Sequence, residues 1–135
     1  MAQEILVKDV LEKDKIAAGK DLLQRLAQTD FRIVAAFWLW TIERNEWRLV
    51  LSSPWQDKHG PLQAYRKIRE TLAQPPELIS HLRLPEVLAL DTKKPLIKAL
   101  RAYAKKYRTN LAGERLRDYW LDHVSVDDSY IYFVK

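Results

Sequence analysis

The sequence contains no cysteine, and it has no hydrophobic run long enough to cross a membrane. The absence of cysteine excludes a disulfide framework and a thiolate zinc site, and the composition suits a reducing compartment, so we expect a cytoplasmic protein. The longest apolar run, IVAAFWLW, has eight residues, whereas a membrane-spanning helix needs about 20. The N-terminal stretch MAQEILVKDVLEKDK becomes charged at once, unlike a secretory signal. We therefore expect a soluble protein without a membrane partner.

Motifs typical of metal and nucleophile sites are also missing. The three histidines, His59, His81 and His123, show neither the H-E-x-x-H nor the H-x₃-H spacing of metal ligands. The loop SSPWQDKHG crowds Ser, Asp, Lys and His together, but the chain has no G-x-S-x-G turn that would expose a nucleophile. We therefore predict no resident metal or cofactor and favour a protein that is not an enzyme.

Length and hydrophobic patterning predict one α+β domain over residues 1–135. A chain of 135 residues with 47% hydrophobic residues can bury one core. The fold class that we predict is a layer sandwich of about five mostly antiparallel strands, ordered along the chain as hairpin, strand and terminal hairpin, with three main helices. The predicted helices cover residues 9–28, 61–73 and 95–107, with a short helical piece near 76–82. The predicted strands cover residues 31–42, 46–53, 86–91 and a terminal pair ending at about 130–134.

The first hairpin is unusually rich in tryptophan. With a turn at Arg44 and Asn45, Trp40 would pair with Leu49, and alternate residues would face the same side of the sheet. That face would hold Trp38, Trp40, Ile42, Trp47, Leu49 and Leu51, and the other face Phe37, Leu39 and Val50. Because both faces of the first strand are apolar, we place this strand centrally and interpret the Trp cluster as core rather than as a base-stacking platform.

Two of the helices have apolar residues at helical spacing. We predict that the helix over 61–73 has Gly60 as its N-cap and Pro61 at its first position. Its predicted inward residues are Leu62, Tyr65, Ile68 and Leu72. The predicted inward residues of the helix over 95–107 are Leu96, Leu100, Tyr103 and Tyr107.

The segment KKPLIKALRAYAKKYR, residues 93–108, carries seven Lys or Arg residues and no acid. Five of these cations recur at spacings of three and four, which places them along one flank of the helix: Lys94, Lys98, Arg101, Lys105 and Arg108. Like charges at these spacings oppose helix formation by a few tenths of a kcal/mol per pair. Such a stripe is typical of contact with a phosphate backbone, and the alternative is a solvated helix face.

A second anion-binding position is predicted in the loop before residue 61. Lys58 and His59 lie beside the free N–H groups at the start of the helix over 61–73, which can hold an anion. The alternative is an ordinary polar connection. Together with the basic stripe, this position makes a binding module for an anionic macromolecule our leading hypothesis. The partner would be nucleic acid bound without sequence preference or, as a variant, an acidic protein.

A metal-dependent nuclease is the enzymatic alternative. The segment EVLALDTKK places Asp91 and Lys93 two residues apart at the end of an apolar strand. This segment resembles the D/E-x-K element of the PD-(D/E)xK nuclease family, in which strand carboxylates hold Mg²⁺ and a lysine positions the attacking water. The resemblance implies Mg²⁺ as cofactor, with Asp57 as the second carboxylate because the preceding strand has no internal Asp. The alternative role of Asp91 is to cap the next helix.

A protein–protein adaptor is the third hypothesis. If the helices left the Trp-rich sheet face open, a second copy could cover it and form a homodimer. Trp55, in the loop beyond the hairpin, is the aromatic residue expected at that interface.

Overall fold

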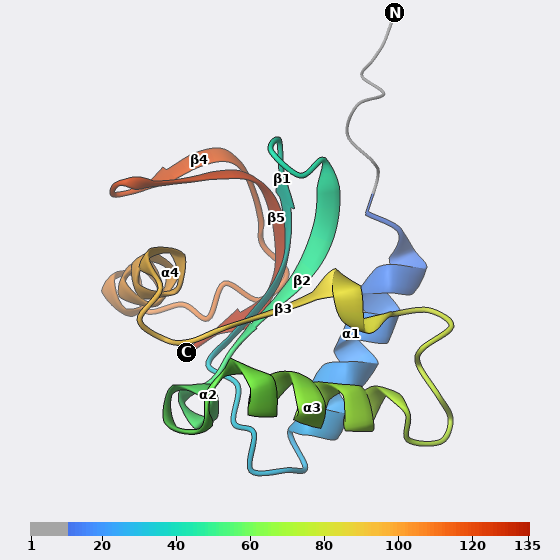
Figure 1. Ribbon diagram of the computed structural model, residues 1–135. Coiled ribbons are helices and arrows are strands. Elements are labelled where there is room, and N and C mark those ends of the chain that lie inside the picture. Colours follow the sequence, from blue (N-terminus) through green and yellow to red (C-terminus); the bar gives the residue numbers. More distant parts are fainter. Residues whose placement is uncertain (1–10) are drawn as a thin grey trace, which may run out of the picture.

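The computed structural model describes residues 11–135 and consists of one curved sheet with helices on both faces (Figure 1). The helices are α1 (Lys13–Leu26), α2 (Pro54–His59), α3 (Pro61–Leu72) and α4 (Pro95–Lys106). The strands are β1 (Ala35–Thr41), β2 (Glu46–Ser52), β3 (Val87–Leu90), β4 (Arg115–Leu121) and β5 (Val124–Val134). The predicted fold class is confirmed; residues 9 and 10 of the first predicted helix lie outside the described residues.

The strands form one mixed sheet in the order β3-β2-β1-β5-β4. β3 runs parallel to β2, and the other neighbours are antiparallel. The apolar strand β1 is central, as predicted, because both of its faces are covered. Pairing of β5 with β1 brings the end of the described chain next to the first hairpin, a long-range contact that decides the shape of the candidate site.

The register of the first hairpin differs from the prediction by two residues. Trp40 pairs with Trp47, and Trp38 pairs with Leu49. The turn covers residues 42–45 rather than Arg44 and Asn45 alone, and it closes with a hydrogen bond from the Asn45 N–H to the Thr41 carbonyl. A shift by two residues keeps every strand side chain on its predicted face, so the predicted assignment of residues to the two faces is still correct. Ile42, however, lies in the turn and is 71% exposed.

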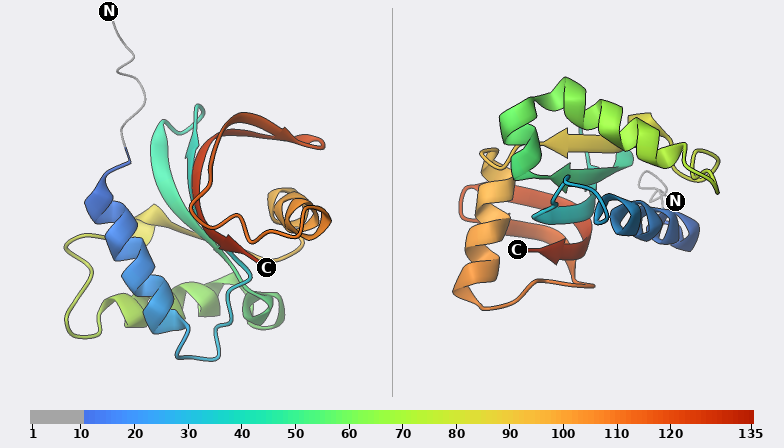
Figure 2. Two further views of the ribbon diagram at one scale, coloured as in Figure 1. Left: turned by 180° about the vertical axis from the view of Figure 1, so that it is seen from behind. Right: turned by 90° about the horizontal axis from the view of Figure 1, so that it is seen from below.

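Two hydrophobic clusters lie on opposite faces of the sheet (Figures 1 and 2). On one face Trp38 and Leu49 pack with residues of α1 and α3, and on the other Phe37 and Val50 pack with residues of α4. Trp38 and Trp40 are buried. The interpretation of the Trp cluster as core is therefore confirmed, and the sheet face that the dimer hypothesis needs open is closed by the chain's own helices.

The inward faces of two helices differ in part from the predictions. In α3, Ile68 and Leu72 are buried as expected, but Leu62 is 69% exposed and Ala64 takes its place. In α4, the buried residues besides Leu100 are Ile97 and Ala104, whereas Tyr107 is 57% exposed. Small and branched side chains let α4 approach the sheet closely, while a tyrosine at a helix end can keep its hydroxyl in water.

Two short segments also differ from the prediction. The segment after β2 is the helix α2, because Ser53 caps it by accepting a hydrogen bond from the Trp55 N–H and Pro54 occupies its first position. Gly60 then caps α3, as predicted. The piece near 76–82 forms turns instead of a helix, and the 3₁₀ helix η2 (Leu84–Glu86) precedes β3.

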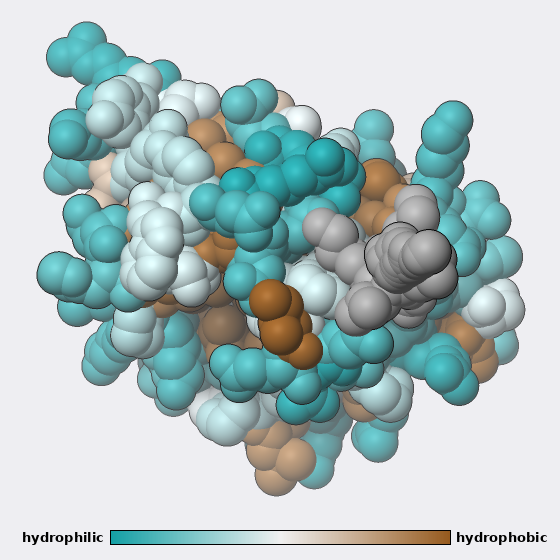
Figure 3. Space-filling model, turned by 90° about the horizontal axis from the view of Figure 1, so that it is seen from above, coloured by the Kyte–Doolittle hydropathy of each residue, from teal (hydrophilic) through white to brown (hydrophobic). Residues whose placement is uncertain are grey.

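The surface carries scattered rather than continuous apolar area on the face seen from above, where small hydrophobic areas are separated by hydrophilic side chains (Figure 3). Among residues 11–135, every helix is too short or too polar to span a bilayer.

Candidate functional site

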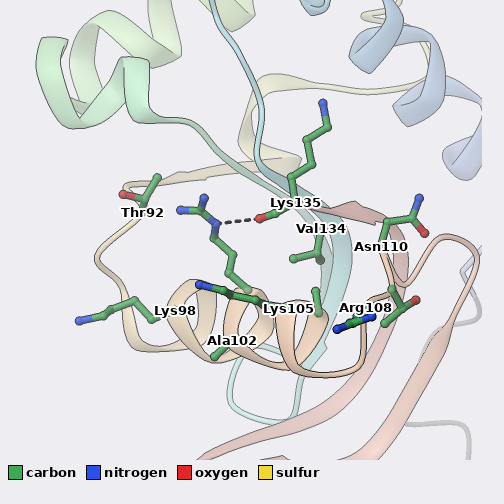
Figure 4. A pocket seen from close by; sticks show the side chains of 11 residues that line it. Thr92, Lys98, Ala102, Lys105, Arg108, Asn110, Val134 and Lys135 are labelled. Carbon is green, nitrogen blue, oxygen red and sulfur yellow. Dashed lines mark hydrogen bonds between the residues drawn. The ribbon is translucent and has the colours of Figure 1, made fainter.

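A cavity of about 680 Å³ lies between α4 and the end of β5, and we refer to it as the α4 cavity (Figure 4). The described residues that line it include five with cationic side chains and none with an acidic side chain: Lys98, Arg101, Lys105, Arg108 and Lys135. Its remaining lining is small or neutral, with Ala102 and Ala104 from the helix and Val134 from β5. This cavity therefore gathers most of the predicted basic stripe on one concave surface.

The packing of α4 explains which cations reach this cavity. Because Ile97, Leu100 and Ala104 face the sheet, the residues one position further along, Lys98, Arg101 and Lys105, lie on the neighbouring flank. Lys94 belongs to the same stripe in sequence, but it precedes the first turn and lines a different cavity. The structure thus brings four of the five predicted stripe residues together and separates Lys94 from them.

Main-chain hydrogen bonds hold the opposite wall of the α4 cavity in place. The Lys135 N–H donates to the Val34 carbonyl at 2.7 Å, and the main-chain oxygen of Lys135 accepts a bond of 2.8 Å from Nε of Arg101. Asn110, in the loop after α4, accepts from the Val134 N–H at 2.8 Å. The side chain of Lys135 points away from α4 (Figure 4). The wall is therefore fixed by backbone contacts, while the ammonium group of Lys135 stays exposed.

Three cations of this cavity have no ion-pair partner within the described part of the chain: Lys98, Lys105 and Arg108. By contrast, Arg115 of β4 forms a bidentate ion pair with the buried Asp128 at 2.7 and 2.9 Å, and this hydrogen bonding raises the pKa of Arg115. The excess of positive charge between residues 92 and 117 is therefore divided between a structural ion pair in the sheet and free cations on α4.

A second cavity of about 1140 Å³ adjoins the first, and we refer to it as the Trp55 cavity. Asn110 and Lys135 line both cavities. The predicted anion-binding residues Lys58 and His59 line the second one, together with Trp55. The structure therefore places Lys58 and His59 in a cavity that adjoins the one lined by the basic helix, although some 40 residues separate them from that helix in sequence.

The anion position predicted before α3 is divided between two cavities. Gly60 and Pro61, which begin α3, line a third cavity of about 400 Å³, whereas Lys58 and His59 face the Trp55 cavity. The N-terminus of α3 and these two side chains therefore do not line a single anion-binding site.

The third cavity contains the residues of the nuclease hypothesis, Asp57, Asp91 and Lys93. Oδ1 of Asp57 accepts a hydrogen bond of 2.8 Å from the Thr92 N–H, and Oδ2 accepts one from the Thr92 hydroxyl. Oδ1 of Asp91 accepts from the Lys93 N–H at 2.9 Å, just before α4. Both carboxylates thus support the β3–α4 connection, and among residues 11–135 no group of three or more acidic, His or Cys side chains is arranged to hold a metal.

Sequence reasoning missed Lys135, Asn110 and Arg32, which line these cavities with the predicted residues. Lys135 follows a stretch with four Asp residues, so local composition gave it no weight. Its place depends on the pairing of β5 with β1, which local patterns do not encode.

Comparison of the chain with protein-family models, with curated proteins and with solved structures gives no match.

Proposed function

We propose that the protein binds nucleic acid through the phosphate backbone, largely without reading the base sequence, and that the α4 cavity makes the contact. The observation that carries this proposal is the composition of that cavity, which is lined by five cationic side chains and no acidic side chain among the described residues. Uncompensated like charges oppose helix formation, although Lys105 lies in the last turn of α4, where the helix dipole favours a cation. Release of counterions on phosphate binding gives the stripe a favourable role in binding.

The length of the stripe suits several phosphates. Lys98 and Lys105 are seven residues apart on α4, which corresponds to about 10 Å along the helix, and Arg108 follows just beyond the helix end. With a phosphate every 3.4 Å or so along a stacked strand, the helical part of the stripe spans about three phosphates. Contacts to phosphate groups fix the position of a nucleic acid but do not discriminate between base sequences. The interaction is therefore expected to depend on salt far more than on sequence.

The acidic-protein variant is separated by a competition experiment. Fluorescence anisotropy of a labelled mixed-sequence oligonucleotide at about 50 mM salt measures binding where electrostatic affinity is high. We expect affinities within a few-fold for shuffled sequences, and little displacement by polyglutamate at equal charge. No binding of the oligonucleotide under these conditions rejects the proposal, and equal competition by polyglutamate favours an acidic protein.

A magnesium-dependent nuclease is the second candidate, because Asp57, Asp91 and Lys93 line one cavity. Carboxylate oxygens are ligands that Mg²⁺ prefers, and a bound ion would activate a water and stabilise charge on the phosphate. The hydrogen bonds of both carboxylates to residues 92 and 93 favour a structural role instead. The nuclease hypothesis stays a prediction, and Asp57 offers its test below.

A further inference from the structure

We infer that the nucleic acid is bound as a single strand, which runs from the α4 cavity into the Trp55 cavity and stacks a base on His59. This inference rests on the proposed function and names the form of nucleic acid that the site takes. It is carried by the junction of the two cavities and by an aromatic stack beside it.

The junction lies at the end of β5. Asn110 and Lys135 line both cavities, and the C-terminal end of the described chain lies between α4 and α2 in Figures 1 and 2. The main chain of Lys135 closes one wall of the α4 cavity through Arg101, while its side chain points away from α4 (Figure 4). A ligand that follows the cations must therefore turn at Lys135 as it leaves the helix.

The path remains cationic beyond this turn. Arg32 and Lys58 are exposed and line the Trp55 cavity, and its lining contains one acidic side chain, that of Asp30. Asp30 forms an ion pair of 2.7 Å with Lys67, and hydrogen bonding to Lys67 lowers the pKa of Asp30. The negative charge of Asp30 is thus paired with the positive charge of Lys67, which does not line the cavity. The Trp55 cavity can therefore accept a further phosphate.

His59 offers a ring surface in this cavity. Its imidazole stacks on Trp55, with 4.0 Å between ring centroids and 21° between ring planes. Nδ1 of His59 lies 2.9 Å from the Trp55 carbonyl oxygen, which can only accept, so this nitrogen carries the proton. Nζ of Lys67 lies 5.0 Å from the centroid of the Trp55 ring, so this ring already contacts both His59 and Lys67 and is not the surface on which a base would stack. His59 itself is exposed, and a base that stacks on its outer face would extend an existing, ordered stack.

A duplex does not suit this arrangement. Its bases are paired inside the helix and cannot reach His59, and its persistence length of about 50 nm resists a turn within one small domain. A single strand is flexible, exposes its bases, and binds typically through a positive groove combined with aromatic side chains. Both features are present here within adjoining cavities.

Anisotropy measurements with matched probes test the inference. The probes are a mixed-sequence strand of about 12 nucleotides as DNA and as RNA, the DNA duplex of the same sequence, and an abasic DNA strand with the same number of phosphates. The proteins are the wild type, His59→Ala, His59→Phe and Trp120→Ala. Trp120 is 68% exposed and lines neither cavity, so its variant controls for the loss of an exposed aromatic ring.

We expect the wild type to bind single strands at least about tenfold more tightly than the duplex. Removal of one stacking side chain weakens binding by about 5- to 100-fold, so His59→Ala should lose that factor on strands with bases and little on the abasic strand. His59→Phe should recover most of the loss because it keeps a ring, and Trp120→Ala should bind like the wild type. The DNA and RNA arms show which sugar is preferred.

Several outcomes overturn the inference and leave the proposed function standing. The first is equal affinity of the wild type for the duplex and the single strand. The second is an equal loss of affinity for the abasic strand and the normal strand in His59→Ala. The third is a His59→Phe variant that has the same melting temperature as the wild type but does not recover the lost affinity. Absence of wild-type binding to every probe overturns the proposed function itself.

Discussion

Nε of Arg101 donates a hydrogen bond of 2.8 Å to the main-chain oxygen of Lys135 and so joins α4 to the end of β5. Arg101 is half-buried, whereas Lys98 and Lys105 on the same flank are exposed. The stripe therefore contains two kinds of cation. Arg101 shapes the α4 cavity, and its neighbours are free to contact a ligand.

Replacement of Arg101 should affect both the fold and binding. Arg101→Gln removes a charge and the hydrogen bond that orders Lys135, so we expect it to weaken oligonucleotide binding more than Lys98→Gln does. Its free energy of unfolding should fall by about 0.5–1.5 kcal/mol, the usual range for one hydrogen bond, while that of Lys98→Gln stays within about 0.5 kcal/mol of the wild type. Urea denaturation and anisotropy measure the two effects. Equal oligonucleotide affinity of the two variants would show that the hydrogen bond between Arg101 and Lys135 does not contribute to binding.

Gly19 of α1 is predicted to be intolerant of even one methyl group. A Cβ at this position would lie 2.3 Å from the Tyr132 hydroxyl oxygen, which accepts a hydrogen bond of 2.8 Å from Trp38 Nε1 and donates one of 2.6 Å to the Ile16 carbonyl. Burial raises the pKa of Tyr132, which keeps this hydroxyl protonated as a donor.

We expect Gly19→Ala to lower the free energy of unfolding by about 1–3 kcal/mol, because overpacking outweighs the gain of about 1 kcal/mol in helix propensity. Chemical denaturation measures this change. Ala17→Ser, at an exposed position of the same helix, is the control and should change stability by less than about 0.5 kcal/mol. A stabilised Gly19→Ala variant would mean that Tyr132 moves freely.

Asp57 separates a structural role from a catalytic one. Asp57→Ala removes both hydrogen bonds to Thr92 and should cost about 0.5–2 kcal/mol of stability, as the loss of a capping side chain does. Asp57→Asn keeps an acceptor for the Thr92 N–H and should cost less. Gel analysis of a labelled strand with Mg²⁺ checks the alternative. Cleavage by the wild type that disappears in a folded Asp57→Asn variant would establish the nuclease and contradict a purely structural Asp57.

The sequence predicted the elements of this fold better than their mutual arrangement. The alternation in the first hairpin assigned Trp38 and Phe37 to opposite core faces correctly even though the register was wrong, because a shift of two residues preserves both faces. Helical spacing selected Leu100 but also Tyr107, which is exposed, because periodicity does not reveal where a sheet ends beneath a helix.

The candidate site was predictable only where it is local in sequence. The cations of α4 follow from helical spacing, so four of them could be assigned to one flank. The place of Lys135 in both cavities depends on the position of β5 between β1 and β4. Long-range strand order has no short-range signal, which is why the continuity of the two cavities appears only in the structure.

The salt dependence of binding tests the central claim, namely that the free cations of the α4 cavity contact phosphates. Four contacts, from Lys98, Lys105, Arg108 and Lys135, predict a slope of log K against log salt of about −2.8 on a single strand, so a fourfold rise in salt weakens binding roughly 50-fold. The double variant Lys98→Gln, Lys105→Gln should reduce the slope to about −1.4, because each substitution removes one released counterion.

The matched control is Lys13→Gln with Lys20→Gln, which removes the same charge from exposed positions of α1 on the opposite side of the sheet (Figure 1). The decisive measurement is an anisotropy titration of both double variants and the wild type between about 50 and 200 mM salt. We expect the lower slope for the α4 variant and an unchanged slope for the α1 variant. Equal slopes for the two variants, or no wild-type binding at the lowest salt, would contradict phosphate contact by these cations.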